Sequence, residues 1–423
     1  MNYNGLAEKI YLSPFSIKKY FNILIYLFYS KKVIELISFI IWEAQYLLKL
    51  NSKEISFLNA HPLNYLNDIN NIPHNSDFYN FSKCDESWLL LCRSNSGAIL
   101  GCKYNEQNSL YEFSNGIASI KIAEFTHSIK NIFIDKYDNI FVCSGGIIYK
   151  SHDRGITFYN VLNLTTSESN FREEAITETP NGDIFIGEYA NVREGKGWKF
   201  VGFIYHSKDK GDNWIKLDFL KKEGINKHIH ILKWVNNIQG LILTEGDNKK
   251  GVWVNKSLKQ FKTRTKSSKN GWKKTTKVHI QKGGYTGIIE TKNKILLGTD
   301  YNGGTNFLVI TENLRKKQSL VIPNPYRRSI FHRFVDRIDK NKNEEIWASL
   351  IFKESNKAKS LIMMSRDSGD TWTKVVEYDG TQFEIHFILT SPSIQKEQYI
   401  SLIDKKNELA TTFCISDNET AQK

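Results

Sequence analysis

Short apolar runs, separated by turn residues, dominate the chain from about residue 53 onward. Three of them, 146–150, 201–206 and 360–364, are each followed by a turn and then by a second apolar run of similar length. Runs this short, rich in Ile, Val, Phe and Tyr, are typical of β-strands and too short for most helices. The pattern therefore predicts an all-β domain over residues 53–423, built from strand pairs joined by tight turns.

The turns inside these three strand pairs share one eight-residue pattern. It reads Ser-x-Asp-x-Gly-x-Thr/Asn-Phe/Trp at 151–158, 207–214 and 365–372. The Asp carboxylate can accept backbone N–H bonds within the turn, and the Ser hydroxyl can do the same more weakly. Glycine supplies the positive φ that such turns require. We therefore assign Asp153, Asp209 and Asp367 to folding and not to catalysis.

The spacing of these turns predicts the architecture. Degenerate turns begin near residues 255 and 311, and further strand-turns lie near 103 and 416. With the three full motifs they make seven slots at roughly blade-length spacing, which predicts a seven-bladed β-propeller of four-stranded blades, with six blades as the runner-up. The last repeat lacks a fourth strand, so we expect Glu54–Asn59 to complete the final blade and close the ring.

The repeated turn resembles the Asp-box, or bacterial neuraminidase (BNR) repeat, of the sialidase-like propellers. In that family the box is structural and joins the third and fourth strands of a blade. Residues 171–214 are similar to the sialidase opening, with Arg172 and Ala175 in the places of its first arginine and following alanine. However, Glu173 and Glu174 replace Ile-Pro, and Arg333 is the one candidate for a second triad arginine. A true exo-sialidase is therefore the least favoured activity.

Residues 127 to about 390 are also similar to Asp-box propellers associated with bacterial polysaccharide and glycosyltransferase gene clusters. This similarity rests on three short runs: R-E-x-A at Arg172, H-I-H at His228 and T-E-G-D at Thr244. The resemblance implies a glycan context without fixing a reaction.

Composition fits a large folded domain: 40% of the 423 residues are hydrophobic and only seven are proline. The five cysteines are odd in number and lack metal-binding spacing, which indicates free thiols in a reducing compartment. Residues 1–20 show no secretory signal. We expect a monomer in the cytoplasm, either free or peripheral on the inner membrane.

Residues 1–52 are expected to form a separate helical segment. Within it, residues 20–50 contain two apolar halves around Ser30–Lys32, each too short to span a bilayer core of about 30 Å. Two interpretations stay open. The segment packs on the propeller, or it lies in a membrane interface with Tyr20, Tyr26, Tyr29 and Trp42 at headgroup level.

The net charge of +13 is concentrated in residues 248–289, which contain twelve Lys and Arg and no acidic residue. This stretch is either a solvated basic loop or a surface for an anionic partner, such as acidic polysaccharide or phospholipid headgroups. Because no nucleic-acid-binding motif is present, we expect no nucleic-acid partner.

The starts of the first strands of the blades line one end of the propeller channel, and they are rich in His, Arg and Glu. Together with the ends of the second strands they supply the candidate catalytic residues Glu173, Glu188, His228, His230, Tyr285 and His332, and the candidate substrate-binding residues Arg172, Arg333, His127, Asp300, Glu245 and His386. Asp77, Glu174, Tyr189, Asp247, His279, Tyr301 and Glu384 lie at or near these positions.

These residue types admit several roles. His228 and His230 share a strand face and could hold a divalent metal with a third ligand, or they could contact substrate without one, so no cofactor is certain. Arg172 could clamp a substrate carboxylate or pair with a neighbouring glutamate. Glu173 and Glu188 are the carboxyl groups expected to act as acid or base, and Glu174 is expected to be a structural partner.

The leading hypothesis is a glycan-active enzyme of bacterial surface polysaccharide metabolism. It would act as a lyase or glycoside hydrolase on an acidic, carboxylate-bearing saccharide at the channel. The alternative is a non-catalytic glycan-binding or scaffold propeller at the cytoplasmic membrane.

Overall fold

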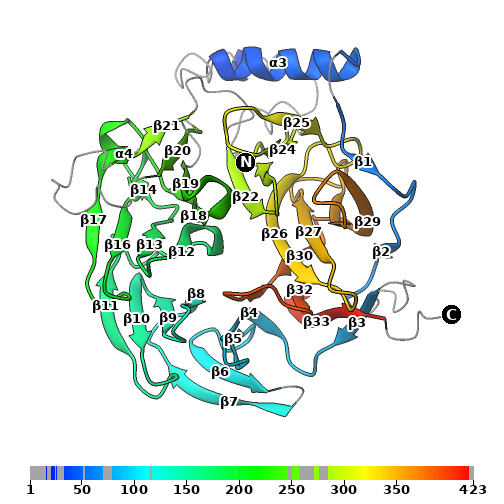
Figure 1. Cartoon of the computed structure of the whole chain (residues 1–423). Helices are drawn as coiled ribbons and strands as arrows, with labels where there is room; N and C mark the ends of the chain where they lie inside the picture. The colour runs from blue at the N-terminus through cyan, green and yellow to red at the C-terminus, as the bar shows by residue number, and fades with distance from the viewer. Residues whose placement is uncertain are drawn as a thin grey trace.

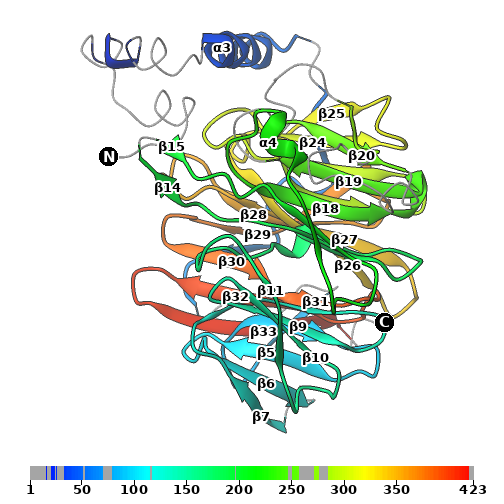
Figure 2. The same cartoon turned by 90° about the vertical axis from the view of Figure 1, so that its left-hand side faces the viewer.

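Seven four-stranded antiparallel sheets surround a central channel in the computed structural model of the chain (Figure 1). The structure describes Ser16, residues 21–23, 25, 33–50, 53–69, 79–114, 117–195, 197–245, 250–256, 271–275 and 284–418. Side by side, the blades form a disc that Figure 2 shows from its edge. The prediction of seven blades is therefore confirmed.

Blades one to three each contain four strands that follow the chain from the channel outward, with one extra hairpin inside blade three. They are β4 (Trp88–Arg93), β5 (Ile99–Lys103), β6 (Ser109–Ser114) and β7 (Ile117–Glu124); β8 (Ile129–Ile134), β9 (Ile140–Ser144), β10 (Ile147–Ser151) and β11 (Tyr159–Asn163); and β12 (Ile176–Glu178), β13 (Ile184–Gly187), β16 (Ile204–Ser207) and β17 (Ile215–Leu217). An extra hairpin, β14 (Arg193–Glu194) with β15 (Gly197–Trp198), lies between β13 and β16.

Blades four to seven follow the same order. They are β18 (Ile229–Val235), β19 (Gly240–Glu245), β20 (Val252–Asn255) and β21 (Lys273–Lys274); β22 (Tyr285–Glu290), β23 (Ile295–Thr299), β24 (Phe307–Thr311) and β25 (Gln318–Val321); β26 (Ile330–Ile338), β27 (Glu344–Ile351), β28 (Ser360–Ser365) and β29 (Thr371–Tyr378); and β30 (Phe383–Phe387), β32 (Gln398–Asp404), β33 (Leu409–Asp417) and β3 (Tyr79–Lys83). The short β31 (Leu389–Thr390) pairs in parallel with β4 and links blade seven to blade one.

Ring closure uses a different strand from the one predicted. β3 pairs antiparallel with β33, from Tyr79 opposite Asp417 to Lys83 opposite Phe413, and completes blade seven. The predicted segment, Glu54–Asn59, instead contributes β1 (Ser56–Phe57), which pairs in parallel with β29 of blade six. β2 (Asn64–Leu66) continues along the same edge. β3 can close the ring because Tyr79 and Phe81 are both 1% exposed and pack into the core beneath it.

Six of the seven predicted turn slots lie at the end of a third strand. The exception is the slot at residue 103, which follows the second strand of blade one. The five cysteines are free, with Cys92, Cys102 and Cys143 buried and Cys84 and Cys414 half-buried.

The core lies between neighbouring sheets, where large aromatic side chains fill the space between blades. Trp88, Trp253, Trp347 and Trp372 are all completely buried. Trp372 comes from the third repeated turn and packs in the cluster that joins blades five and six. The last aromatic of that motif therefore stabilises a contact between blades.

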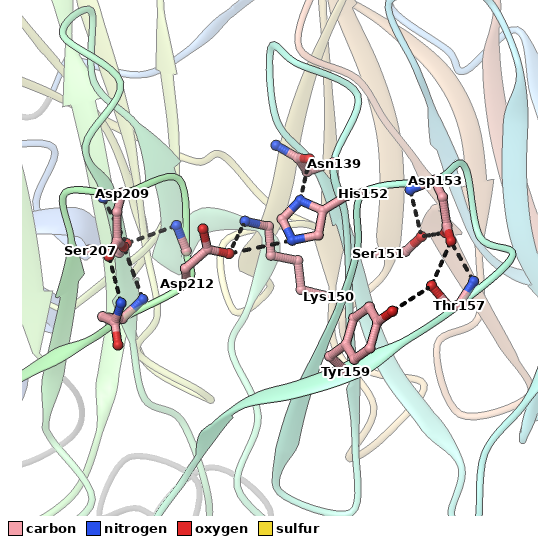
Figure 3. A network of polar contacts seen from close by, with 12 residues as sticks. Asn139, Lys150, Ser151, His152, Asp153, Thr157, Tyr159, Ser207, Asp209 and Asp212 are labelled. Atoms are coloured by element: carbon pink, nitrogen blue, oxygen red, sulfur yellow. Dashed lines mark hydrogen bonds and ion pairs between the residues drawn. The ribbon is translucent and has the colours of Figure 1, made fainter.

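The three Ser-x-Asp-x-Gly turns have the same hydrogen bonds, and Figure 3 shows two of them. In the first turn, Ser151 Oγ donates to Asp153 Oδ1 (2.8 Å) and accepts from the backbone N–H of Gly155 (2.9 Å), and Asp153 Oδ1 accepts from the backbone N–H of Thr157 (2.9 Å). The second and third turns repeat these contacts within 0.1 Å. Each turn connects the third and fourth strands of its blade, and its Asp is bonded as a folding residue would be.

Helix α3 (Val33–Leu47) lies on the rim of the propeller beside blade five (Figures 1 and 2). Trp42 makes an edge-to-face contact with Phe307, at 4.8 Å between ring centroids. Glu43 forms ion pairs with Arg327 (3.0 Å) and Arg328 (2.7 Å). α3 thus packs on the propeller, whereas contact of the segment with a membrane stays a prediction. No described helix is long and apolar enough to span a bilayer.

Three short helical elements with described bounds lie in or next to blades three and four: α4 (Phe219–Lys222) and the 3-10 turns η1 (Glu173–Ala175) and η2 (Asn236–Ile238). Residues 21–23 and 25 are helical as well.

Candidate functional site

A cavity of about 560 Å³ occupies the propeller channel. Its inner end is lined by charged side chains of three blades: Glu173, Glu174, Lys233, Arg333 and Asp336. Its outer end is lined by turns between first and second strands, where Asn236, Asn237 and Lys292 are exposed. The volume is in the range of small-molecule sites. The sequence indicated the end of the channel where the first strands start, whereas the cavity is also lined by the turns that follow the first strands, at the opposite end. Of the predicted residues it includes Glu173 and Arg333.

The short turn η1 places two successive carboxylates at the inner end of the cavity. Its single turn is closed by the backbone N–H of Ala175, which donates to the carbonyl of Arg172 (2.8 Å). Because the turn precedes β12, Glu173 and Glu174 project from the start of the inner strand of blade three. Both line the cavity.

The two carboxyl groups have opposite electrostatic surroundings. Burial alone would raise the pKa of Glu173, but the guanidinium groups of Arg333 (3.8 Å) and Arg172 outweigh it and hold the pKa below its usual range. Burial raises the pKa of Glu174, and Lys233, 4.0 Å from its carboxylate, only partly opposes that effect. One carboxylate is thus kept ionised beside one that holds its proton more tightly.

Arg333 and Lys233 are held by backbone carbonyls next to these carboxylates. Arg333 donates to the carbonyl oxygens of Phe387 (2.5 Å) and Leu389 (3.2 Å), which ties blade six to blade seven. Lys233 donates to the carbonyl of Glu173 (3.0 Å), and its side chain stays 37% exposed. Arg333 is therefore fixed in place, whereas Lys233 can reach a ligand in the cavity.

Arg172 lies at the start of blade three, next to Glu173. Its guanidinium is 5.5 Å from the ring of Tyr189, and within the described residues its side chain has neither a hydrogen bond nor an ion pair. The alternative of a close salt bridge to Glu173, Glu174 or Glu188 is not what the structure has. Arg172 is not among the described residues that line the cavity, and its binding to a substrate carboxylate stays a prediction.

His228 and His230 form a joined pair at the start of blade four. His228 Nδ1 is 2.7 Å from the carbonyl of Ala190, to which it donates a hydrogen bond. Its Nε2 lies 3.0 Å from Nε2 of His230, so one of the two rings donates this bond to the other. Within the described part of the chain no group of three potential metal ligands is found.

β-Bulges place two of the predicted histidines. In the pairing of β18 with β19, and of β26 with β27, the register shifts at residues 229/231 and 331/333, leaving His230 and His332 as the extra residues. Such bulges redirect side chains and are common beside functional sites. The strand starts are thus irregular at the positions where the histidines gather.

A second group of charges surrounds His332 between blades six and seven. The rings of His332 and His386 are 4.9 Å apart, and His386 Nε2 is 3.0 Å from Glu384. Glu384 also pairs with Lys353 (2.8 Å). Burial, followed by the charges of His386 and Arg172, holds the pKa of His332 well below its usual value. His332 is therefore neutral at pH 7.

Other predicted residues lie away from the cavity. Glu188 is completely buried and accepts three hydrogen bonds of 2.8 Å, two from Thr165 and one from Tyr205. These contacts favour a structural role, and its assignment as acid or base stays a prediction.

Three further residues are held by local contacts. Tyr285 is 2% exposed and packs in the core of blades four and five. Glu245 accepts a hydrogen bond from the backbone N–H of Gly251 (2.8 Å). His127 is exposed on blade two. Asp300 is half-buried on blade five, its N–H donating to the carbonyl of Gly284 (2.6 Å). Asp77, Asp247 and His279 lie outside the described residues.

Sequence reasoning missed Lys233 and Asp336 and gave Glu174 a structural role. Lys233 and Asp336 lie inside the mostly apolar strands β18 and β26. In such a strand, a single charged residue is the sequence feature that could have indicated a position facing the channel. Burial raises the pKa of Asp336, so it adds another carboxyl group that holds its proton tightly.

Comparison with known proteins adds a partial sequence match. No family model matches the chain. The chloroplast photosystem II stability/assembly factor HCF136 of Guillardia theta is 32% identical over 110 residues, which make up 24% of this chain and 27% of that protein. The match thus spans about a quarter of that relative.

Solved structures resemble the chain at low sequence identity. A chain of the mitotic checkpoint complex matches with a TM-score of 0.51 and 11% identity, over 86% of this chain and 99% of that one. This likeness is one of fold alone. A GH74 enzyme of Niastella koreensis matches with a TM-score of 0.45 and 14% identity, over 65% of this chain and 41% of that one.

Proposed function

We propose that the channel cavity binds and cleaves an acidic saccharide, as a glycoside hydrolase or lyase of bacterial surface polysaccharide metabolism. The observation that carries the proposal is the pair Glu173 and Glu174, which line the cavity and whose environments shift their pKa values in opposite directions. Glycoside hydrolysis commonly uses one protonated and one ionised carboxyl group. Glu174 would be the acid, and Glu173 the base or nucleophile.

The cations around this pair suit a substrate that carries a carboxylate. Arg172 offers a planar fork for bidentate binding, and Lys233 offers a mobile ammonium group at the cavity wall. In a β-elimination a base removes the proton next to the sugar carboxylate, and Glu173, which lines the cavity as an ionised carboxylate, would be that base. The resemblance of the three repeated turns to Asp-boxes supports the glycan context.

Purified protein incubated with a panel of uronate- and nonulosonate-containing oligosaccharides tests the proposal. A lyase gives an unsaturated product that absorbs in the ultraviolet, whereas a hydrolase gives new reducing ends without that absorbance. We expect Glu173→Gln and Glu174→Gln to lower kcat about 10²- to 10⁴-fold, the usual contribution of a general acid or base. Glu344→Gln, an exposed residue of the same cavity, should stay within about twofold and serves as the matched control.

The pH profile assigns the roles. If Glu174 is the acid, Glu174→Gln should remove the fall in kcat on the alkaline side, and Glu173→Gln the fall on the acidic side. Full turnover by both variants, with unchanged thermal unfolding, would show that these carboxylates do not perform the chemistry.

A second candidate is a non-catalytic scaffold or glycan-binding propeller in the cytoplasm, peripheral on the inner membrane. The observation that favours it is the partial match to a protein named as a stability/assembly factor. Under this proposal the panel shows binding without turnover, and Glu173→Gln and Glu174→Gln bind as tightly as the wild type.

A further inference from the structure

Helix α3 has two apolar faces, and the propeller covers only one of them. The covered face carries Phe39, Trp42, Glu43 and Tyr46, spaced as one side of a helix. Phe39 is 6% exposed, and Tyr46 packs under Arg327, which lies 4.1 Å from its ring. This face alone accounts for the attachment of α3 to blade five.

The opposite face of α3 carries large apolar side chains that are about half exposed or more. The exposed fractions along it are Ile37 53%, Ile40 54%, Ile41 46%, Leu47 74% and Leu48 67%. Residues 37, 40, 41 and 48 have the helical spacing of a single stripe, which we call the α3 stripe together with Leu47. In both views α3 lies outside the disc with the propeller on one side only (Figures 1 and 2).

Charge around the stripe favours an anionic, two-dimensional partner. Glu43 of α3 points to the propeller and is paired with two arginines. Lys49 follows the helix and is exposed. Blade four, next to the blade that carries α3, exposes Lys256, Lys273 and Lys274 at the two ends of its basic connection.

The length of α3 decides how it can meet a bilayer. Fifteen helical residues extend about 22 Å, less than the roughly 30 Å of a hydrocarbon core. A helix with one polar attachment and one apolar stripe lies in the interface plane, with its apolar side toward the acyl chains. A second copy of this chain fits less well, because it would bring together two highly basic molecules.

We propose that the α3 stripe inserts into the headgroup–acyl boundary of an anionic membrane, with Lys256, Lys273 and Lys274 of blade four on the adjacent headgroups. The rim of the disc then faces the lipid and the channel runs along the membrane surface. This proposal goes beyond the proposed activity and does not depend on the cavity.

Flotation of the full-length protein with vesicles tests it. One set of vesicles is pure phosphatidylcholine and the other contains 30% phosphatidylglycerol. We expect the wild type to float with the anionic vesicles, at least tenfold less with the neutral ones, and less in 1 M salt than in 0.1 M salt. Failure to float with the anionic vesicles would overturn the proposal.

Paired variants isolate the stripe. Ile40→Ser with Leu47→Ser should reduce flotation at least tenfold. Ile156→Ser with Leu409→Ser removes side chains that are 82% and 56% exposed elsewhere and should leave flotation unchanged. Equal flotation of the two double variants contradicts the assignment. So does a wild-type dimer in light scattering that the α3 variant alone converts to monomer, because a second copy would then cover the stripe.

Discussion

A buried carboxylate, Glu345, holds the closing strand against blade six, and its removal should destabilise the ring. Its side chain and that of Arg337 are both completely buried, with Nε and Oε2 2.9 Å apart. The other oxygen accepts from Nε of Arg366 (2.9 Å), and Tyr79 of the closing strand β3 lies 3.4 Å from it. The network therefore connects blade six with the strand that completes blade seven.

Glu345→Ala should lower the free energy of unfolding by about 3–5 kcal/mol, the usual effect of removing one partner of a buried ion pair. Arg337 keeps an ion pair with Asp417, which reduces the loss. Trp347 Nε1, 3.2 Å from Glu345, loses its acceptor, which increases the loss by about 1 kcal/mol. We therefore expect about 4 kcal/mol.

Two variants in the same region give the scale. Arg366 is 43% exposed, so Arg366→Ala should cost no more than about 1 kcal/mol. Glu344, next to Glu345 in β27, is exposed, and Glu344→Ala should change stability by less than about 0.5 kcal/mol. Urea unfolding followed by tryptophan fluorescence measures all three, with equal m-values required for comparison. If Glu345→Ala loses no more than Glu344→Ala, this network does not secure closure.

Two further predictions concern the repeated turns. Gly211 has φ +89°, and a Cβ there would lie 2.4 Å from the ring of Phe141. Gly211→Ala should therefore lower the unfolding free energy by more than about 1 kcal/mol in the same urea assay. Gly197→Ala is the control and should be nearly neutral, because a Cβ at Gly197 meets nothing nearer than 3.9 Å. Hydrogen bonds from Thr157 lower the pKa of Asp153 to about 2, and those from Asn213 outweigh burial and lower the pKa of Asp209 to about 2 as well. Because these pKa values are depressed on folding, the stabilisation is complete above about pH 4 and is lost as the pH falls toward about 2. Melting temperatures across this range should fall less steeply for Asp153→Asn with Asp209→Asn, and an unchanged slope would contradict the assignment.

The fold was predictable where local chemistry repeats. Each Ser-x-Asp-x-Gly turn is closed within one motif, so three copies located three blades. Their spacing predicted the number of the other blades, although the slot near residue 103 follows a second strand and not a third. Closure was not predictable in the same way, because Glu54–Asn59 and Tyr79–Lys83 are both short strand-like runs. Only the pairing of Tyr79 with Asp417, across the whole length of the chain, distinguishes them.

The candidate site was predictable where charges cluster in sequence and missed where they stand alone. Arg172 and Glu173 belong to a conspicuous charged run; Glu173 lines the cavity, and the charge of Arg172 helps to lower its pKa. Lys233 and Asp336 reach the same cavity from inside apolar strands. The catalytic role expected of Tyr285 stays a prediction, but its surroundings were not predictable: the register of β22 shifts between Tyr285 and Gly287, and the tyrosine packs in the core between blades. Alternation along a strand cannot reveal such a shift.

The place of β3 in the chain has a consequence for synthesis on the ribosome. The strand is made first among those of the ring, yet its hydrogen-bonding partner β33 ends at Asp417, roughly 330 residues later. At about 5–20 residues per second, the strand waits about 20–70 s for its partner to be translated. Throughout that time Tyr79 and Phe81, which are buried in the finished blade, have no sheet to cover them. The nascent chain therefore carries an unpaired, half-apolar strand at its leading end until the last blade is made.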